Sequence, residues 1–389
     1  MKSMKKIWSV LRSLATGLSL SGSLPIWALL MLLAPVAAYA HEAYVLPKDD
    51  FWRELHGPVS FYALKALTRP ADLRITLYVV TGTMIMLALN FFFRRTRFGY
   101  RVHRLPEKLS FMGPIFVRAA ISASFFYSAL SWSFLGPELT LQSMPWPWLM
   151  RGTLFAASGM IAVGFMTEVA AAAALAIFAV GYWEFGLYVM TYFNYLGEII
   201  VLILFGMRKW SVDRYLFGAL KRFPRFRHYE TSIVRILYGV ALIYAAVLVK
   251  FLHPALTTRV VVEWHLTKFH WLFPSDPLLV ALGAGMAECA IGFFILIGFE
   301  MRLTVLISLF YITLSLMYFR EMVWPHFMLY GISLSLLVKP EVFTLDHLLF
   351  DRERRKHSLW RRPFLPHLPE HAPERANGRA AEIAVSVNE

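Results

Sequence analysis

Long apolar stretches, separated by short charged segments, dominate the chain between residues 73 and 338. An α-helix rises about 1.5 Å per residue, so roughly 20 apolar residues cross the hydrocarbon core of a bilayer. The pattern predicts nine transmembrane helices, at residues 73–93, 113–135, 148–166, 169–185, 188–206, 232–252, 277–298, 303–319 and 323–338. The apolar run from Val169 to Gly206 is too long for one helix and is expected to fold back around Gly181–Gly186. The predicted fold class is an all-α polytopic membrane protein.

The first forty residues have the layout of a secretory signal peptide. A basic start, Met1–Arg12, precedes the apolar run Leu24–Ala38, and Ala38-Tyr39-Ala40 forms a small-x-small cleavage signal. We expect cleavage before His41, which leaves residues 41–72 as a polar external segment ahead of the helix at 73–93. An uncleaved anchor is the alternative, and it also places residue 41 outside the membrane.

Residues 111–206 and 232–340 carry the same pattern twice. The matching residues include Arg118 and Arg235 at an offset of 117, and Gly164 and Gly298, and Gly197 and Gly331, at an offset of 134. The change of 17 residues falls in one loop, so the second copy contains an insertion there. Because each copy begins and ends on the same side of the membrane, the sequence predicts two parallel four-helix-bundle repeats, preceded by one N-terminal helix.

Basic residues concentrate in the loops that nine spans, starting outside, place in the cytoplasm. They are Arg94, Arg95, Arg97, Arg101, Arg104 and Lys108, then Arg208, Lys209, Arg214, Lys221, Arg222, Arg225 and Arg227 in the cytoplasmic loop at 207–231. The tail at 341–389 is also basic, and its composition predicts partial disorder. This distribution predicts a prokaryotic inner membrane protein with the mature N-terminus outside and the C-terminus in the cytoplasm. It also accounts for the formal charge of +14, so the lipid bilayer is the expected partner and nucleic acid is not.

Ionisable residues enter the predicted membrane region mainly in the second copy. Glu288 lies near the middle of the span 277–298, where an ionised carboxylate is costly and therefore marks a functional candidate. A hydrogen bond that joins two helices is the structural alternative. Lys250 and His253 are three residues apart and are predicted to share one face at the outer end of their helix. His326 begins the last span from the same side.

The first copy lacks these groups. Ser133, Gly136 and Tyr192 stand where the second copy has Lys250, His253 and His326. We therefore expect the first bundle to be mainly structural and the second to carry the chemistry. The inserted loop adds aromatic and ionisable residues at the same end of the second bundle: Glu263, Trp264, His265, His270 and Trp271.

Residues 235–338 resemble the DoxX family of four-helix membrane proteins. The residues that carry the resemblance are Arg235, Gly239 and Lys250 on the first helix of the unit, and Glu288, Gly292, Gly298 and Arg302 around its second helix. The first copy is similar but more diverged. The family includes subunits similar to the membrane part of thiosulfate:quinone oxidoreductase. The resemblance implies a quinone-facing bundle in which Lys250 and Glu288 pair across helices or handle protons.

The leading hypothesis is a membrane subunit of a quinone-linked redox system that works with a redox partner subunit. Four residues are the candidate catalytic groups, Glu288, Lys250, His253 and His326, and four are expected to contact the quinone, Lys250, His253, His326 and Trp264. Glu288 would relay a proton, Lys250 would stabilise anionic charge on the quinone, and the histidines would polarise its carbonyl. The sequence contains no nucleotide loop, flavin motif or cluster-binding cysteines, so electrons would come from a partner or directly from substrate.

Two other classes of function stay open on the sequence. A copper- or metal-handling or transport protein is one, because the α-amine and imidazole of a mature N-terminal His41 could chelate copper. A non-catalytic membrane scaffold subunit is the other. Cys289 is the only cysteine, which excludes an internal disulfide, a CxxC pair and a cysteine metal cage.

Overall fold

The computed structural model describes residues 42–60, 68–206, 211–217, 229–268, 275–339 and 343–348. The predicted signal peptide, His41, and the tail from residue 349 lie outside these ranges. Within them, six helical segments are long and apolar enough to cross a membrane: Thr76–Arg95, Arg101–Leu130, Thr167–Phe205, Glu230–Leu252, Pro277–Ile297 and Met301–Phe319. A shorter apolar helix follows at Trp324–Val338. The protein is therefore a helical membrane protein.

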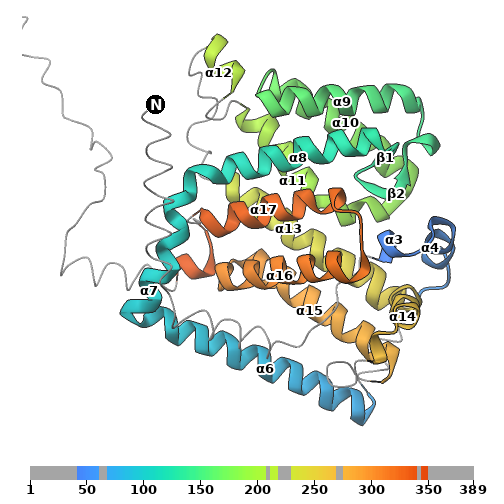
Figure 1. Cartoon of the computed structure of the whole chain (residues 1–389), viewed down its shortest axis with the longest axis vertical. Helices are drawn as coiled ribbons and strands as arrows, with labels where there is room; N and C mark the ends of the chain where they lie inside the picture. The colour runs from blue at the N-terminus through green and yellow to red at the C-terminus, as the bar shows by residue number, and fades with distance from the viewer. Residues whose placement is uncertain are drawn as a thin grey trace, which may run out of the picture. The chain divides into compact units, whose positions relative to one another are not determined.

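The elements of the first half run in the order that the apolar pattern predicts (Figure 1). They are α3 (Glu42–Val45), α4 (Lys48–Leu55), α6 (Pro70–Arg95), α7 (Arg97–Arg104), η1 (Leu105–Met112), α8 (Gly113–Leu130), β1 (Ser133–Phe134), β2 (Gly136–Thr140), η2 (Leu141–Ser143), α9 (Pro147–Val163), α10 (Thr167–Phe185), η3 (Gly186–Tyr192) and α11 (Phe193–Phe205). The helix α10 ends at Gly186, which has a positive φ of 61°, and α11 packs back against α10. The predicted turn in the long apolar run is therefore present.

The second half adds the helices of the other bundle. They are α12 (Val212–Phe217), α13 (Glu230–Ala245), the π-helical segment η5 (Ala246–Leu252), α14 (Pro254–Glu263), η6 (Leu266–Lys268), α15 (Pro277–Ile297), α16 (Met301–Phe319), η7 (Trp324–His326) and α17 (Phe327–Val338). The insertion of the second copy contains α14 and η6. We call the end of the bundles that carries α3, α4, the β1–β2 hairpin and α14 the outer end, following the orientation predicted from the loop charges (Figure 1, right).

A short antiparallel hairpin differs from the all-helical expectation. The span predicted at 113–135 ends as a helix at Leu130, and β1 pairs with β2 just beyond it. Trp132 and Leu135 both have positive φ, at 55° and 57°, which a continuing helix does not permit. The hairpin closes the outer end of the first bundle and carries a carboxylate, Glu138, that is 1% exposed.

The two bundles pack through reciprocal contacts between their first and last helices, with α8 against α17 and α11 against α13. A Cβ on Gly331 would meet Ala120 and the backbone of Val117, and a Cβ on Gly197 would meet Leu237 and the backbone of Val234. The two contacts involve equivalent positions. Gly331 meets Val117 and Ala120, and Gly197 meets Val234 and Leu237, which lie 117 residues further along the chain. Small residues at both crossings allow the helices to approach closely.

Both bundles also close their inner helical turn in the same way. Asp213 accepts hydrogen bonds from the backbone N–H groups of Met166 (2.8 Å) and Thr167 (3.3 Å) at the start of α10. Asp346 accepts them from Glu300 (2.8 Å) and Met301 (3.2 Å) at the start of α16. In each case the aspartate satisfies N–H groups that a helix start leaves unpaired. Both aspartates lie beyond the repeat boundaries predicted at 206 and 340.

The N-terminal segment covers the outer end, where α3 packs against both β2 and α14 (Figure 1). Phe51 is fully buried there and Leu46 is 5% exposed. Its apolar side chains therefore anchor this otherwise polar segment against both bundles.

Candidate functional site

Two glycines set the distance between the helices that carry the central charges. A Cβ on Gly239 of α13 would lie 2.7 Å from the carbonyl oxygen of Gly292 on α15, and a Cβ on Gly292 would lie 2.9 Å from the carbonyl oxygen of Gly239. Both distances are too short for real atoms, so only glycine permits this crossing. These are two of the residues on which the family resemblance rests, and their role here is close helix packing.

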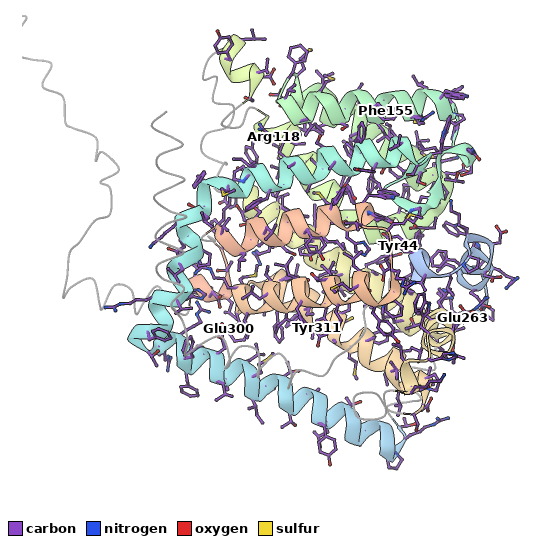
Figure 2. The ribbon with its side chains drawn as sticks, in the orientation of Figure 1. Tyr44, Arg118, Phe155, Glu263, Glu300 and Tyr311 are labelled. Atoms are coloured by element: carbon purple, nitrogen blue, oxygen red, sulfur yellow. The ribbon has the colours of Figure 1, made fainter. Side chains whose placement is uncertain are left out.

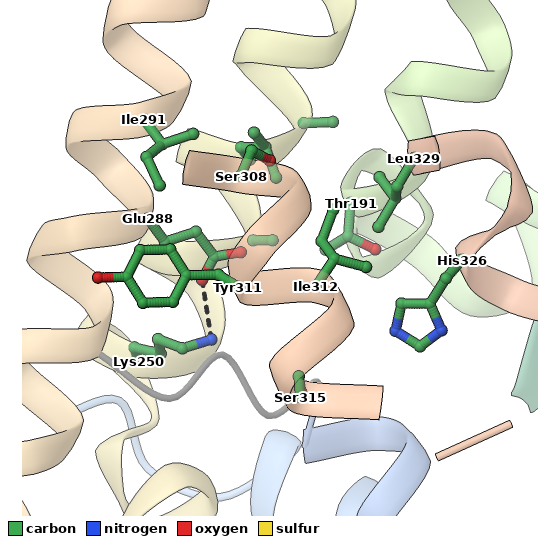
Figure 3. Close-up of a pocket in the computed structure, with 13 residues that line it drawn as sticks. Thr191, Lys250, Glu288, Ile291, Ser308, Tyr311, Ile312, Ser315, His326 and Leu329 are labelled. Atoms are coloured by element: carbon green, nitrogen blue, oxygen red, sulfur yellow. Dashed lines mark ion pairs between the residues drawn. The ribbon is translucent and has the colours of Figure 1, made fainter. Parts of the chain in front are cut away.

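Lys250 and Glu288 form an ion pair across this crossing, with Nζ and Oε2 2.9 Å apart (Figure 3). Lys250 is 4% exposed and Glu288 is 8% exposed. Lys250 belongs to the π-helical segment η5, and such segments are frequent at functional sites. Pairing offsets part of the cost of placing two charges away from water. The pairing expected from the family resemblance is therefore present in the structure.

A pocket in the second bundle opens beside this ion pair (Figure 3). Its empty volume is about 690 Å³, part of which is open to the surroundings. Its polar lining residues include Lys250, Glu288, Tyr311, Ser315, His326 and Thr191. Its apolar part is formed by Ala241, Leu242, Ala245, Ile291, Ile312 and Leu329. Thr191 comes from the first bundle. The pocket therefore combines an apolar wall with a few convergent polar groups, which is the usual character of small-molecule sites.

His326 lies on the opposite side of the pocket from the ion pair (Figure 3). Its Nε2 is 3.0 Å from Oε2 of Glu321, and its Nδ1 is 3.0 Å from the carbonyl oxygen of Met322. Ser315, which also lines the pocket, donates to Oε1 of Glu321 at 2.6 Å. A carboxylate beside one ring nitrogen fixes the orientation of the imidazole. The pocket thus has an ionisable pair on each side.

His253 and Trp264 lie outside the pocket lining. His253 begins α14 and lies against the backbone of Glu54 and near His56, and burial lowers the pKa of its imidazole. The carbonyl oxygen of Trp264 accepts a hydrogen bond from Tyr318 (3.0 Å), and its ring packs against Phe319. Of the predicted site residues, the structure therefore brings Lys250, Glu288 and His326 together and separates His253 and Trp264 from them.

The other ionisable groups expected at the outer end do not converge on the pocket. Glu263 pairs with Arg259 at 2.7 Å, Arg259 also bonds Asp50 at 2.6 Å, and His265 is exposed. His270 and Trp271 lie outside the described residues. Among the described residues no group of three or more His, Cys, Asp or Glu side chains is arranged to hold a metal ion. The candidate copper ligand, His41, precedes the first described residue.

A buried carboxylate in the first bundle is a functional candidate that sequence reasoning missed. Glu138 Oε1 accepts hydrogen bonds from the hydroxyls of Tyr192 (2.5 Å) and Tyr188 (2.9 Å), and Tyr44 lies 3.0 Å from Tyr192, oxygen to oxygen. A Cβ on Gly136 would clash with this carboxylate and with Tyr192. Burial raises the pKa of the Glu138 carboxyl from 4.5 to about 7. The first copy has Gly136 where the second copy has His253, and this difference is the one sequence signal that could have drawn attention to Glu138.

Two further charged residues of the family pattern have structural partners. Arg235 donates to the carbonyl oxygens of Ile295 (3.0 Å), Leu296 and Phe343 (3.0 Å), at the inner end of α15. Arg302 pairs with Glu107 of η1 at 3.1 Å. Arginines close to the last carbonyls of a helix stabilise its end. These two residues hold the inner ends of the helices and do not contribute to the pocket.

An acidic cluster joins α6 to the second bundle at the inner end. Arg94 bonds both Glu300 (2.9 Å) and Asp346 (3.1 Å), and Asn90 donates to the same Glu300 oxygen. Glu300 is labelled in Figure 2 at the inner end of the bundle. Burial raises the pKa of its carboxyl to about 7. The cluster is therefore an anchor for the N-terminal helix, far along the bundle from Lys250.

Comparisons with protein-family models, with curated proteins and with solved structures returned no match for this chain.

Proposed function

We propose that the protein is the quinone-binding membrane subunit of a redox system of a prokaryotic inner membrane, similar in kind to the DoxX family. The observation that carries this proposal is the buried Lys250–Glu288 ion pair beside a largely apolar pocket. A quinone is an apolar ring with oxygen acceptors at two ends, and the pocket offers a cationic donor at one side and His326 at the other. This match identifies a class of ligand and not a particular quinone. Among the described residues that line the pocket, no set of carboxylates is arranged to hold a metal ion.

The architecture in the proposal is two parallel four-helix repeats and one N-terminal helix, with nine membrane crossings. The reciprocal glycine contacts at Gly197 and Gly331 support the duplication, as do the matching caps at Asp213 and Asp346. Helices overlap every predicted span, and basic loops follow the predicted inner ends. This arrangement gives an external N-terminus and a cytoplasmic C-terminus.

The pocket residues have distinct chemical roles in this proposal. The Lys250 ammonium donates to a quinone oxygen and stabilises the negative charge that develops there on reduction. The Glu288 carboxyl exchanges a proton with that oxygen, since it lies 2.9 Å from the Lys250 ammonium that binds the oxygen. His326, held by Glu321, serves the opposite side of the ring as a hydrogen-bond donor or acceptor. The apolar wall formed by residues such as Ile291 and Leu329 excludes water from the ring.

The electron source in this scheme is a second protein or a reducing substrate such as thiosulfate. The sequence has one cysteine and no motif for a nucleotide, flavin or iron–sulfur cluster. In this proposal electrons therefore reach the quinone from outside the chain, as they do in a membrane subunit that works with a redox partner.

The experiment is quinone binding by the detergent-purified full chain. Wild-type protein is expected to retain extractable quinone and to bind an added short-chain quinone, whereas Lys250→Met and Glu288→Gln weaken binding at least tenfold. Arg259→Gln removes an ion pair of the outer surface and is the matched control, expected to bind as wild type does. Absence of quinone binding in the wild type, or equal binding by all variants, contradicts the proposal.

A further inference from the structure

We propose that Glu138 exchanges protons with the Lys250–Glu288 pocket through Tyr192, Tyr44 and His326. The inference rests on the proposed function, because it assigns a proton route to that pocket. Its groups come from the hairpin and η3 of the first bundle, from the N-terminal segment, and from η7 of the second bundle. It gives the first bundle a part in the chemistry that the sequence assigned to the second bundle alone.

The Glu138 carboxylate is the proton acceptor at one end of the route. Glu138 is 1% exposed, and its Oε1 receives both tyrosine hydroxyls while Oε2 has no hydrogen-bond partner among the described atoms. Gly136 supplies the space that the carboxylate and the Tyr192 hydroxyl occupy. An unpaired buried acceptor costs free energy, and the cost is greatest when the carboxylate is ionised. A protonated carboxyl tolerates this environment much better.

The hydrogen bonds between these groups have a defined direction. Tyr192 has one hydroxyl proton and gives it to Glu138, so its oxygen accepts the proton of Tyr44, 3.0 Å away. The sequence of donors is therefore Tyr44 to Tyr192 to Glu138. Such an aligned row moves a proton toward the carboxylate without displacing a side chain.

Tyr44 joins this row to the second bundle. Its ring packs edge-to-face on the ring of His326, with centroids 5.3 Å apart, and it points into the junction of the two bundles (Figure 2). His326 in turn lines the pocket and bonds Glu321. The transfer between His326 and the Tyr44 hydroxyl requires a rotation of the imidazole about its side-chain bonds.

The proton balance of the route is closed. The route begins with the imidazolium form of His326 and the ionised carboxylate of Glu138. When His326 gives up one N–H proton and becomes a neutral imidazole, the Tyr44 oxygen gains that proton and releases its own hydroxyl proton to Tyr192. The Tyr192 oxygen gains that proton and releases its hydroxyl proton to Oε1 of Glu138. Both tyrosines end unchanged and Glu138 ends as a neutral carboxyl. Reversing each transfer carries a proton inward, from Glu138 to His326.

The charged and titratable groups around Glu138 are few. Tyr188 and Tyr192 of η3, Tyr195 of α11 and Tyr44 of α3 face it, and the exposed Lys48 of α4 acts on it electrostatically. Trp52 of α4 donates its indole N–H to the backbone carbonyl of Glu138 at 3.3 Å and covers the outer side. Near neutral pH the pKa of about 7 leaves Glu138 divided between its two protonation states. This is the condition under which a carboxyl exchanges protons most readily.

The test is infrared spectroscopy of the full-length protein titrated between pH 5 and pH 9. We expect a protonated-carboxyl band with a midpoint near neutral pH that disappears in Glu138→Gln. Tyr44→Phe, which keeps the ring and removes the hydroxyl, and His326→Gln are both expected to shift that midpoint. His265→Gln changes an exposed histidine at the same end and is expected to leave it unchanged. A missing band, or a midpoint equal to wild type in both Tyr44→Phe and His326→Gln, overturns the proposal.

This readout does not depend on quinone, so it separates the two proposals. If the wild type binds no quinone and the midpoint still shifts, the proposed function fails and the coupling stands. If quinone is bound and reduced, Tyr44→Phe is expected to lower the reduction rate at least tenfold with an unchanged quinone Kd. An unchanged rate in that variant contradicts the route while leaving the quinone site intact.

Discussion

Tyr192 and His326 lie at the start of the last helix of each bundle, 134 residues apart, and each contacts a buried carboxylate at the outer end. Tyr192 donates to Glu138 at 2.5 Å, and His326 lies 3.0 Å from Glu321. Tyr44 contacts both of them, through its hydroxyl on one side and its ring on the other. The two bundles therefore have similar polar arrangements at their outer ends, built from different chemical groups.

Breaking the central ion pair from one side is expected to be more damaging than removing it entirely. Lys250→Met and Glu288→Met each leave one buried ionisable group without its partner, at a cost of about 3–5 kcal/mol for buried pairs. The double variant leaves two apolar side chains and is expected to be more stable than either single one. Thermal unfolding in detergent measures this, and additive losses in the double variant would show that the two residues do not interact.

The close crossing of α13 and α15 predicts a strong response to a single methyl group. Gly292→Ala places a Cβ 2.9 Å from the Gly239 carbonyl oxygen and is expected to destabilise the protein by about 1–3 kcal/mol. Gly283→Ala on the same helix adds a Cβ with nothing within 4 Å and is the control. Melting temperatures in detergent compare the two, and equal values would contradict the crossing.

Glu138 predicts a specific dependence of stability on pH. Its pKa is raised in the folded state, so the folded protein binds the proton more tightly than the unfolded chain does. The stabilisation is complete below pH 4.5 and is lost as pH rises to about 7, a change of roughly 3 kcal/mol. Glu138→Gln is expected to flatten this part of the curve. Unfolding followed from pH 4 to pH 8 tests it, with Glu54→Gln in the neighbouring helix α4 as the control.

The membrane topology is open to direct labelling. In a Cys289→Ser background, Ser143→Cys lies on the exposed loop between the hairpin and α9, and Thr96→Cys lies on the exposed turn after α6. An impermeant maleimide applied to intact cells with a permeable outer layer is expected to label the first and spare the second. The reverse pattern would invert the orientation deduced from the basic loops.

The sequence predicted the helices and the central pair because both depend on local pattern and on the depth of charge in an apolar span. The position of His253 was predicted wrongly, because residues three apart share a face only where the helix from Lys250 onward is regular. The chain instead passes through π-helical turns and breaks at His253, whose φ and ψ are −124° and 59°. Residues three apart do not share a face across such a break.

Glu138 was missed for a different reason. Apart from Gly136, which stands where the second copy has His253, nothing in the sequence around Glu138 marks it as a buried group, because it follows a proline in a short strand outside the apolar spans. Its environment is made by Tyr192, 54 residues later, and by Tyr44, which reaches it only through tertiary packing. Side-chain clusters assembled from distant segments are not visible in periodicity or spacing.

The position of Tyr44 has a consequence for how the protein is made. This residue leaves the ribosome among the first, yet its contact His326 lies in the last helix of the second bundle. The segment 42–60 can therefore dock only after α17 has been inserted, so its docking is one of the last steps in the assembly of the protein. Protease resistance of that segment would report whether a given molecule had completed its assembly.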